Sequence, residues 1–532
     1  MQMAERAGEP DVLVIGGGAV GTMLACDLLQ QGVSVRVVDR KEVLDDGDPH
    51  SRAVLIWPRM LELLHRIGVV DDLVSLGFRI TGVGYFSGGR RLGTVPMDRL
   101  GTALPFTLSL PQREIEKVLR RRFADLGGVY ELGTTLEAID PDGPAVELRG
   151  ADGVVRTARP KWVIGSDGVG STTRRLLEVP YPGKPFELGI SIGDFPVSGP
   201  LGTEVEYHYS RNGLLPMIPM TDGVGRMASI VPPVGDGWES FTREQLQEIV
   251  NKRASLPYRI GEPKWIRTFQ PRPGIAERFR IGRTFLVGDS AHCVVPLGGQ
   301  GLNLGIQDAF NLGWKLGGVI RGRLPEPILD TYDAERRRAA QQVTAVVDKQ
   351  ILAARQVKPL PSLVRDVVVS TARVTGMLEK VAAPLIGGVG LAYGKPQQRS
   401  LLRPQPKRVR PGQRVPFHST NGPRIGRGLL DPERFTALLW PGAATPGAWA
   451  EDRAEVTALL DGTAAVCDLA GLPARERAGL VAVFGRRPVV ALVRPDGHLA
   501  ALAPVSRPQP VLSFLATATT ARKAPDPATL AG

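Results

Sequence analysis

The chain has 532 residues, of which 43% are hydrophobic and 23% are charged, and its formal net charge at pH 7 is +12. This length suits several folding units and this balance is ordinary for a globular protein, which excludes a fibrous or disordered chain. The basic residues are scattered rather than gathered in one tail, so the charge favours a solvated surface or a general attraction for phosphorylated cofactors over nucleic-acid binding.

The first elements predict a parallel sheet. Residues 11–16 and 33–39 are short apolar runs typical of buried strands, and residues 19–31 between them have the pattern of a helix. Strand, helix and strand within about 30 residues make a βαβ unit. We expect neither a secretory signal nor a membrane-spanning helix, because no apolar run precedes these elements and none reaches about 18 residues. The expected location is the cytoplasm.

The middle of the chain mixes helical and strand patterns. Helical spacing predicts helices over residues 56–67 and 112–126, and alternation predicts hairpin strands over 128–149. Residues 162–165 predict another buried strand. Residues 186–232 are rich in Gly, Pro and β-forming residues, which predicts a mostly antiparallel sheet with one face available for a ligand.

A further buried strand is predicted at residues 285–288, followed by a glycine-rich turn and a helix over 305–321. Longer helical patterns cover 334–355 and, with breaks, 363–394. The many Pro, Arg and Gly residues at 395–425 are typical of a linker.

Beyond this linker, residues 435–440, 464–469 and 489–494 predict short strands of a separate small α/β domain. The three cysteines, Cys26, Cys293 and Cys467, form no Cys-x-x-Cys pair, so we expect reduced thiols and no thiolate metal site.

The glycine motif at residues 16–21 (GGGAVG) matches G-x-G-x-x-G between a predicted strand and a predicted helix. Its glycines permit a tight turn, close approach of a pyrophosphate, and helix–strand packing. The next strand ends at Asp39, which is placed to accept a hydrogen bond from a ribose hydroxyl. An acid there favours FAD or NAD over a nucleotide with a 2′-phosphate.

A second motif, residues 285–303, reads strand, Gly288-Asp289, a stretch reaching Pro296, and the glycine-rich entry to a helix. A carboxylate after a buried strand can accept from a ribityl hydroxyl, and a helix amino end favours the negative charge of a reduced flavin. An NAD dehydrogenase does not need this element, so the motif favours a flavin.

Together with residues 163–174 (VIGSDGVGSTTR) and 307–316 (QDAFNLGWKL), these motifs resemble those of the FAD-dependent group A aromatic hydroxylases, which act on phenols and polyketides. The resemblance covers residues 10–395, and Ser51-Arg52-Ala53 and residues 110–113 (LPQR) are similar as well. It implies a p-hydroxybenzoate-hydroxylase-like fold. Residues 490–498 (VALVRPDGH) resemble the thioredoxin-like C-terminal domain of larger members, although the chain departs from that pattern after His498.

The expected fold class is therefore α/β, with a Rossmann-like βαβ FAD-binding domain, an antiparallel substrate sheet and a thioredoxin-like C-terminal domain. The expected boundaries are 1–180 and 276–400 for the FAD-binding domain, 181–275 for the substrate domain, and 401–520 for the C-terminal domain.

The resemblance implies a monooxygenase that uses NADPH or NADH as a transient co-substrate and hydroxylates a phenolic or polyketide-derived aromatic, as in antibiotic biosynthesis. Oxygen would be transferred through a flavin C4a-hydroperoxide, and water must be excluded from it. Baeyer–Villiger insertion or epoxidation by the same peroxide, and a non-catalytic flavin-binding protein, stay open as alternatives. We expect an aromatic small molecule and O2 as partners, with no nucleic acid or membrane, and leave a homodimer open.

No protein side chain is expected to carry the catalysis, and no metal is expected. The expected cofactor-binding residues are those of the motifs and their neighbours: Gly16, Gly18, Ala19, Val20, Gly21, Asp39, Arg40, Arg52, Gln112, Asp167, Gly288, Asp289, Pro296, Gly299, Gly301, Leu302 and Asn303. The expected substrate contacts are Tyr207, His208, Tyr209, Met217 and Pro296. We expect His292 to have a structural or flavin-orienting role rather than to act as a base.

Overall fold

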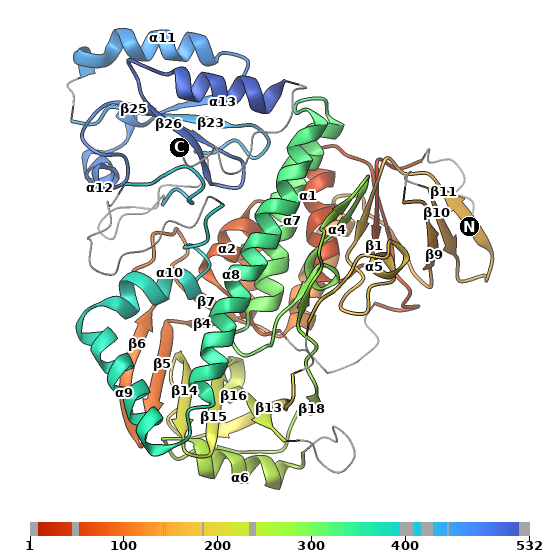
Figure 1. Cartoon of the computed structure of the whole chain (residues 1–532), viewed down its shortest axis with the longest axis vertical. Coiled ribbons are helices and arrows are strands. Elements are labelled where there is room, and N and C mark those ends of the chain that lie inside the picture. The colour runs from red at the N-terminus through yellow and green to blue at the C-terminus, as the bar shows by residue number, and fades with distance from the viewer. Residues whose placement is uncertain are drawn as a thin grey trace.

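The computed structural model describes residues 9–44, 53–141, 143, 145–183, 186–232, 241–393, 408–416, 429–443 and 446–520. In Figure 1 a six-stranded sheet lies to the right of the long helices α7 (Gln300–Ile320) and α8 (Asp330–Ala354), and an eight-stranded sheet lies at the lower end of α8. A C-terminal unit lies at the top, at the opposite end of the molecule from the eight-stranded sheet.

The six-stranded sheet confirms the predicted parallel strands. Its order is β20-β21-β12-β1-β2-β8, and all its neighbours are parallel except β20 and β21. Its central strands are almost wholly buried because helices cover the sheet, which explains their continuous apolar runs. Its strands are β1 (Val12–Ile15), β2 (Val35–Val38), β8 (Tyr130–Glu131), β12 (Trp162–Gly165), β20 (Arg280–Ile281) and β21 (Thr284–Leu286).

Helices α1 (Ala19–Gln30), α2 (Pro58–His65) and α4 (Gln112–Asp125) lie where the sequence predicts them, but α7 begins at Gln300, five residues before the predicted start. Glycine is a poor helix former, so this run suggests a loop. Close packing explains the glycines: a Cβ on Gly305 would lie 2.6 Å from the Val20 side chain of α1.

The eight-stranded sheet has the order β17-β13-β16-β15-β14-β5-β6, with β18 also paired to β13. Its pairs are antiparallel except β14 with β5. Since β5 and β6 come from residues 82–96, this sheet is not confined to the range 181–275 predicted for the substrate domain. Its strands are β5 (Gly82–Ser87), β6 (Arg90–Pro96), β13 (Gly189–Ser198), β14 (Glu204–Ser210), β15 (Gly213–Pro219), β16 (Val224–Val231), β17 (Arg259–Ile260) and β18 (Trp265–Phe269).

Helix α6 (Arg243–Arg253) packs on one face of this sheet, and α9 (Pro359–Val374) packs against β6 (Figure 1). Shorter elements complete this part of the molecule: strands β3 (Leu55–Ile56), β4 (Phe78–Ile80), β7 (Thr107–Ser109), β9 (Thr135–Ile139), β10 (Val146–Arg149), β11 (Val155–Ala158), β19 (Gly274–Ile275) and β22 (His292–Cys293), and helices α3 (Val70–Leu76), α5 (Thr172–Leu176) and α10 (Ala383–Ile386). The predicted hairpin is β9 with β10.

The C-terminal unit has a four-stranded sheet, β24-β23-β25-β26, and three helices. Three of its strands were predicted, whereas β26 was not, because its sequence LAALAP has weak strand propensity. The elements are β23 (Thr436–Trp440), β24 (Ala465–Asp468), β25 (Val489–Val493), β26 (Leu499–Pro504), α11 (Ala450–Leu460), α12 (Ala474–Phe484) and α13 (Gln509–Thr519).

The predicted linker, residues 395–425, lies mostly outside the described residues. Its described part, 408–416, packs on the C-terminal unit: the backbone N–H groups of Gly412 and Val415 donate to the carbonyls of Leu499 and Gly497. Val409 and Val415 are buried in that unit's apolar core. This stretch is therefore part of a packed structure.

Within the described ranges, no helix is both long enough and apolar enough to cross a bilayer. Over the same ranges, no cluster of three or more His, Cys, Asp or Glu side chains could hold a metal ion.

Candidate functional site: a cavity between the glycine loop and the eight-stranded sheet

The glycine loop connects β1 to α1. Gly16 has a φ of +103°, and a Cβ there would lie 2.6 Å from the carbonyl oxygen of Ser166, so only glycine fits. Gly18 is different, since a Cβ there would meet no atom within 4 Å. The loop thus leaves open space in front of the amino end of α1, where the first N–H groups of a helix have no intrahelical partner.

Asp39 supports this loop from the end of β2. Its carboxylate accepts hydrogen bonds from the backbone N–H of Gly17 at 2.7 Å and of Lys41 at 2.9 Å. Asp167 has a similar role: it accepts from the backbone N–H of Thr173 at 2.9 Å and so caps α5. Both acids hold backbone around the cavity, and neither lines it.

Asp289 lies in a 3₁₀ turn, Gly288–Ser290, directly after β21. Gly288 has a φ of +65°, and its N–H donates to the buried carboxylate of Asp308 at 3.1 Å. His292, fully buried, contacts the same carboxylate at 2.5 Å through Nε2. This arrangement exposes Asp289 toward the cavity while its neighbours on both sides are buried.

The entry to α7 forms the next wall. Gly299 is left-handed, with a φ of +61°, and precedes Gln300, Gly301 and Leu302 along the cavity. Asn303 is buried and fastens this turn, because its amide donates to the Leu55 carbonyl at 2.7 Å and accepts from the Trp57 N–H at 2.9 Å.

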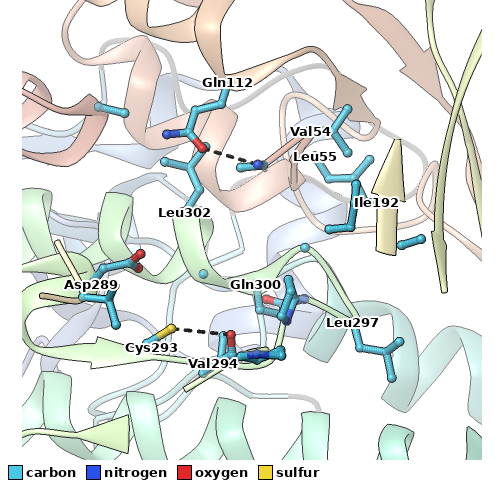
Figure 2. Close-up of a pocket in the computed structure, with 18 of the residues that line it drawn as sticks. Val54, Leu55, Gln112, Ile192, Asp289, Cys293, Val294, Leu297, Gln300 and Leu302 are labelled. Atoms are coloured by element: carbon cyan, nitrogen blue, oxygen red, sulfur yellow. Dashed lines mark hydrogen bonds between the residues drawn. The ribbon is translucent and has the colours of Figure 1, made fainter. Parts of the chain in front are cut away.

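These walls enclose one cavity of about 500 Å³, within the range of small-molecule and cofactor sites. In Figure 2, Gln112, Leu302 and Asp289 border the cavity, and Ile192 and Leu297 lie further along it. Gln112 accepts from the backbone N–H of Ala53 at 3.3 Å. The expected cofactor residues that line the cavity are Gly18, Ala19, Val20, Gln112, Asp289, Pro296, Gly299, Gly301 and Leu302.

The remaining expected cofactor residues do not line it. Gly16, Asp39, Asp167 and Gly288 are in the supporting turns, Gly21 and Asn303 are in the first turns of α1 and α7, and Arg40 is exposed. Arg52 lies outside the described residues. In the structure Asp39, Asp167 and Asn303 make hydrogen bonds that shape the backbone around the cavity, and their direct contact with the cofactor stays a prediction.

The other part of the cavity is built on the eight-stranded sheet. Apolar side chains dominate it, and from this sheet and the 294–297 segment they are Ile192, Pro216, Ile218, Ala228, Phe269, Val294 and Leu297. Tyr207 also lines it, and its hydroxyl donates to the Leu297 carbonyl at 3.0 Å. Burial raises the pKa of this tyrosine well above its usual value, so it stays neutral.

Three of the expected substrate contacts do not line this cavity. His208 faces the opposite side of β14, where its Nε2 lies 2.9 Å from Glu206, and Met217 lies in the core under α6. Tyr209 shares the face of Tyr207 but packs against Tyr85 and under Arg365, away from the cavity. Strand alternation separates His208 from the tyrosines, but it does not say which face borders the cavity.

Arg226 on β16 is a cavity residue that the sequence analysis missed. It is 2% exposed, and its guanidinium donates to both oxygens of Asp194, at 2.7 and 2.9 Å. Trp265 Nε1 donates to the same carboxylate at 2.8 Å. A charged side chain alternating with apolar ones in a buried strand was the available signal. The arginine brings a paired charge, rather than a net one, to an otherwise apolar wall.

These features fit FAD. The open space at Gly18 and the helix amino end suit a pyrophosphate, and Asp289 suits a sugar or ribityl hydroxyl. A Cβ on Gly301 would also meet no atom within 4 Å, so a flat ring can approach the backbone at the start of α7.

Comparison with known proteins agrees. A family model described as an FAD binding domain matches residues 9–347. The chain is 29% identical over 522 residues to the 12-dehydrotetracycline 5-monooxygenase/anhydrotetracycline 6-monooxygenase of Streptomyces rimosus, covering 92% of this chain and 94% of that protein. It is 37% identical over 344 residues to a rifampicin monooxygenase of Streptomyces venezuelae, covering 63% of this chain and 69% of the relative.

The match spans between 60% and 69% of the length of that rifampicin enzyme and of two further monooxygenases. Among solved structures, the OxyS anhydrotetracycline hydroxylase from Streptomyces rimosus superposes with a TM-score of 0.71 at 26% identity, over 97% of this chain and all of that one. Since the family model matches more than half of the chain, this protein belongs to the FAD-binding-domain family of FAD-dependent aromatic monooxygenases.

Proposed function

We propose that the protein is an FAD monooxygenase that uses NADPH or NADH to hydroxylate a large, neutral aromatic molecule, polyketide-derived or phenolic. The observation that carries this proposal is a cavity whose wall changes from glycine backbone and Asp289 at one end to apolar sheet residues at the other. The relatives named for tetracycline and rifampicin chemistry support a polycyclic substrate.

The cofactor end would hold FAD by backbone and one carboxylate. The amino end of α1, next to Gly18, would bind the pyrophosphate, because its N–H groups and dipole favour negative charge. Asp289 would accept from the ribityl chain. The amino end of α7, at Gly301 and Leu302, would stabilise negative charge on the reduced ring.

The substrate end would select by shape and exclude water. Its apolar wall favours an aromatic ring system, and the pairing of Arg226 with Asp194 leaves little gain for a substrate carboxylate. When bound, reduced FAD supplies the activation of O2, of which one atom enters the substrate and the other leaves as water. The contribution of Tyr207 is to hold the 294–297 segment through its hydrogen bond to Leu297.

The test is oxygen incorporation by the purified, FAD-loaded protein. A panel of polycyclic phenols is incubated with NADPH or NADH under isotopically labelled O2, and products are separated by mass. We expect substrate-stimulated NAD(P)H oxidation and one labelled oxygen on an aromatic carbon. Label only from water contradicts the proposal, an ester or epoxide product indicates the alternative oxygen insertions, and no NAD(P)H oxidation with any compound indicates a flavin-binding protein.

A site of action in the cytoplasm follows from the need for NAD(P)H and stays a proposal. A homodimer stays a prediction, for which sedimentation of the FAD-loaded protein is the measurement.

A further inference from the structure

A network of buried charges joins the C-terminal unit to helices α7 and α8. Each of its six members is at most 5% exposed, and acids and bases are equal in number. We call these residues the interface network: Asp308, Lys315, Glu335, Arg336, Arg494 and Asp496. Buried charges are stable only when they are paired, so the position of each member depends on the others.

At the C-terminal end, the turn after β25 carries Arg494, Asp496 and His498. Arg494 donates to both oxygens of Glu335, at 2.5 and 2.9 Å, and to Asp496 at 2.6 Å. Lys315 of α7 donates to the same Glu335 at 2.8 Å. This turn therefore fixes a carboxylate in the second turn of α8.

Arg336 directly follows Glu335 on α8, and its side chain contacts the part of the network that lies nearer the cavity. The guanidinium of Arg336 donates to the Tyr393 hydroxyl at 3.2 Å. The ring of Tyr393 packs at a tilt against His498, with centroids 4.2 Å apart, and the Arg494 guanidinium lies 5.0 Å from the centre of the Tyr393 ring. The turn thus also contacts Arg336 indirectly, through Tyr393.

At the cavity end, Arg336 donates to the Asp308 carboxylate at 2.6 Å and to the Leu304 carbonyl of α7 at 3.1 Å. The other oxygen of Asp308 receives the Gly288 N–H and His292. Gly288 directly precedes Asp289. A chain of contacts therefore runs from Arg494 to the turn that borders the cofactor end of the cavity: one ion pair joins Arg494 to Glu335, a second joins the adjacent Arg336 to Asp308, and Tyr393 contacts both arginines.

We infer that the Arg494-Pro-Asp-Gly-His498 turn is a positioning element for FAD: through Glu335, Arg336 and Asp308 it sets the geometry of the Gly288–Ser290 turn and so of Asp289. Replacing Arg494 leaves the buried Glu335 with Lys315 and Asn311 alone and removes the cation over the Tyr393 ring, whose hydroxyl accepts from Arg336. The start of α8 must then move to satisfy Glu335. The inference rests on the proposed role of Asp289 at the ribityl chain.

The experiment uses full-length Asp496→Asn, Arg494→Met and Arg494→Lys variants. For each, the Kd for FAD, the visible spectrum of the bound flavin and the Tm of the apoprotein are measured. We expect Asp496→Asn and Arg494→Met to raise the Kd by roughly tenfold and to shift the flavin spectrum. Arg494→Lys keeps the charge but loses the bidentate contact with Glu335, so its Kd for FAD is expected to lie between that of Arg494→Met and that of the wild type.

The matched control is Arg323→Met, which breaks the 2.7 Å ion pair with Glu433 at the same interface but outside the network. It is expected to leave the Kd and spectrum unchanged. If the network variants lower only the apoprotein Tm, as a purely structural contact would, the inference is overturned. Should Arg494→Met fail to fold, the milder Asp496→Asn and Arg494→Lys variants decide by the same two readouts.

A double variant tests whether the two ends communicate. Asp308→Asn is combined with Asp496→Asn, and we expect the combined rise in Kd to be smaller than the product of the single effects, because both interrupt one chain. Independent, multiplying effects contradict the inference. A normal Kd for FAD in Asp289→Asn contradicts the proposed cofactor site itself. A raised Kd in Asp289→Asn together with a normal Kd in the network variants contradicts only the positioning role.

Discussion

At the scale of single residues, the acids around the cavity divide into two groups. Asp289 borders the cavity, while Asp39, Asp167 and Asp308 accept backbone N–H groups of the surrounding turns. A motif in the sequence does not separate these roles, because a carboxylate can serve either a ligand or its own backbone. Measurements on FAD affinity distinguish them.

Asp289→Asn is expected to raise the Kd for FAD by roughly tenfold or more, since a hydrogen bond to a charged acceptor contributes about 1.5–3 kcal/mol. Fluorescence titration of the apoprotein with FAD measures it. The apoprotein Tm is expected to stay close to the wild type because the side chain is exposed to the cavity. An unchanged affinity would remove Asp289 from the cofactor site.

Gly18→Ala is expected to block pyrophosphate approach without harming the fold. The φ of Gly18 is −70°, which alanine tolerates, and its Cβ would project into open space. Gly170→Ala is the matched control, because a Cβ there also meets nothing within 4 Å but Gly170 does not line the cavity. Loss of FAD in the control, or its retention in Gly18→Ala, would contradict the assignment.

At the scale of elements, packing rather than propensity decides where α7 begins and how it lies on α1. Glycines on one side of α7 allow this contact: added Cβ atoms on Gly305, Gly313 and Gly317 would lie within 2.6 Å of side chains on α1 or at its end. Helix α7 therefore lies close enough to α1 for its amino end to reach the same cavity.

Gly305→Ala reverses the usual rule for helices. Alanine normally stabilises a helix interior by about 1 kcal/mol over glycine, but the clash with Val20 is expected to cost about 1–3 kcal/mol. Gly301→Ala, in the same helix and facing open space, is expected to keep or raise the apoprotein Tm. Thermal unfolding of both variants without FAD measures the difference. Equal Tm values would show that the Val20 side chain moves to accommodate the added methyl group without a loss of stability.

At the scale of the whole molecule, the C-terminal unit is bound to the rest by buried charges. Burial alone would raise the pKa of Glu335, but Arg494 and Lys315 outweigh it and lower that pKa to about 2. Burial also lowers the pKa of Lys315 to about 8, which Glu335 opposes. At neutral pH both groups are charged, so the interface holds paired ions.

Acid should weaken this interface through Glu335. A carboxyl whose folded pKa is depressed contributes stability above its ordinary value of 4.5, and that stability is lost as pH falls toward 2. The contribution is on the order of 3 kcal/mol. Glu335→Gln is expected to be less stable than wild type near neutrality but to lose less between about pH 5 and pH 3. Parallel slopes of Tm against pH would contradict this prediction.

The sequence by itself determined the βαβ start, the parallel strands and the cofactor class. Residues 16–21 and 285–303 indicate these strands and the flavin locally, through the spacing of glycines, acids and buried apolar runs. Tertiary structure decided which face of β14 borders the cavity, that Arg226 is paired there with Asp194, and that Arg494 reaches Glu335. Those facts depend on contacts between residues far apart in the chain, and a local pattern records which side chains share a face but not what that face meets.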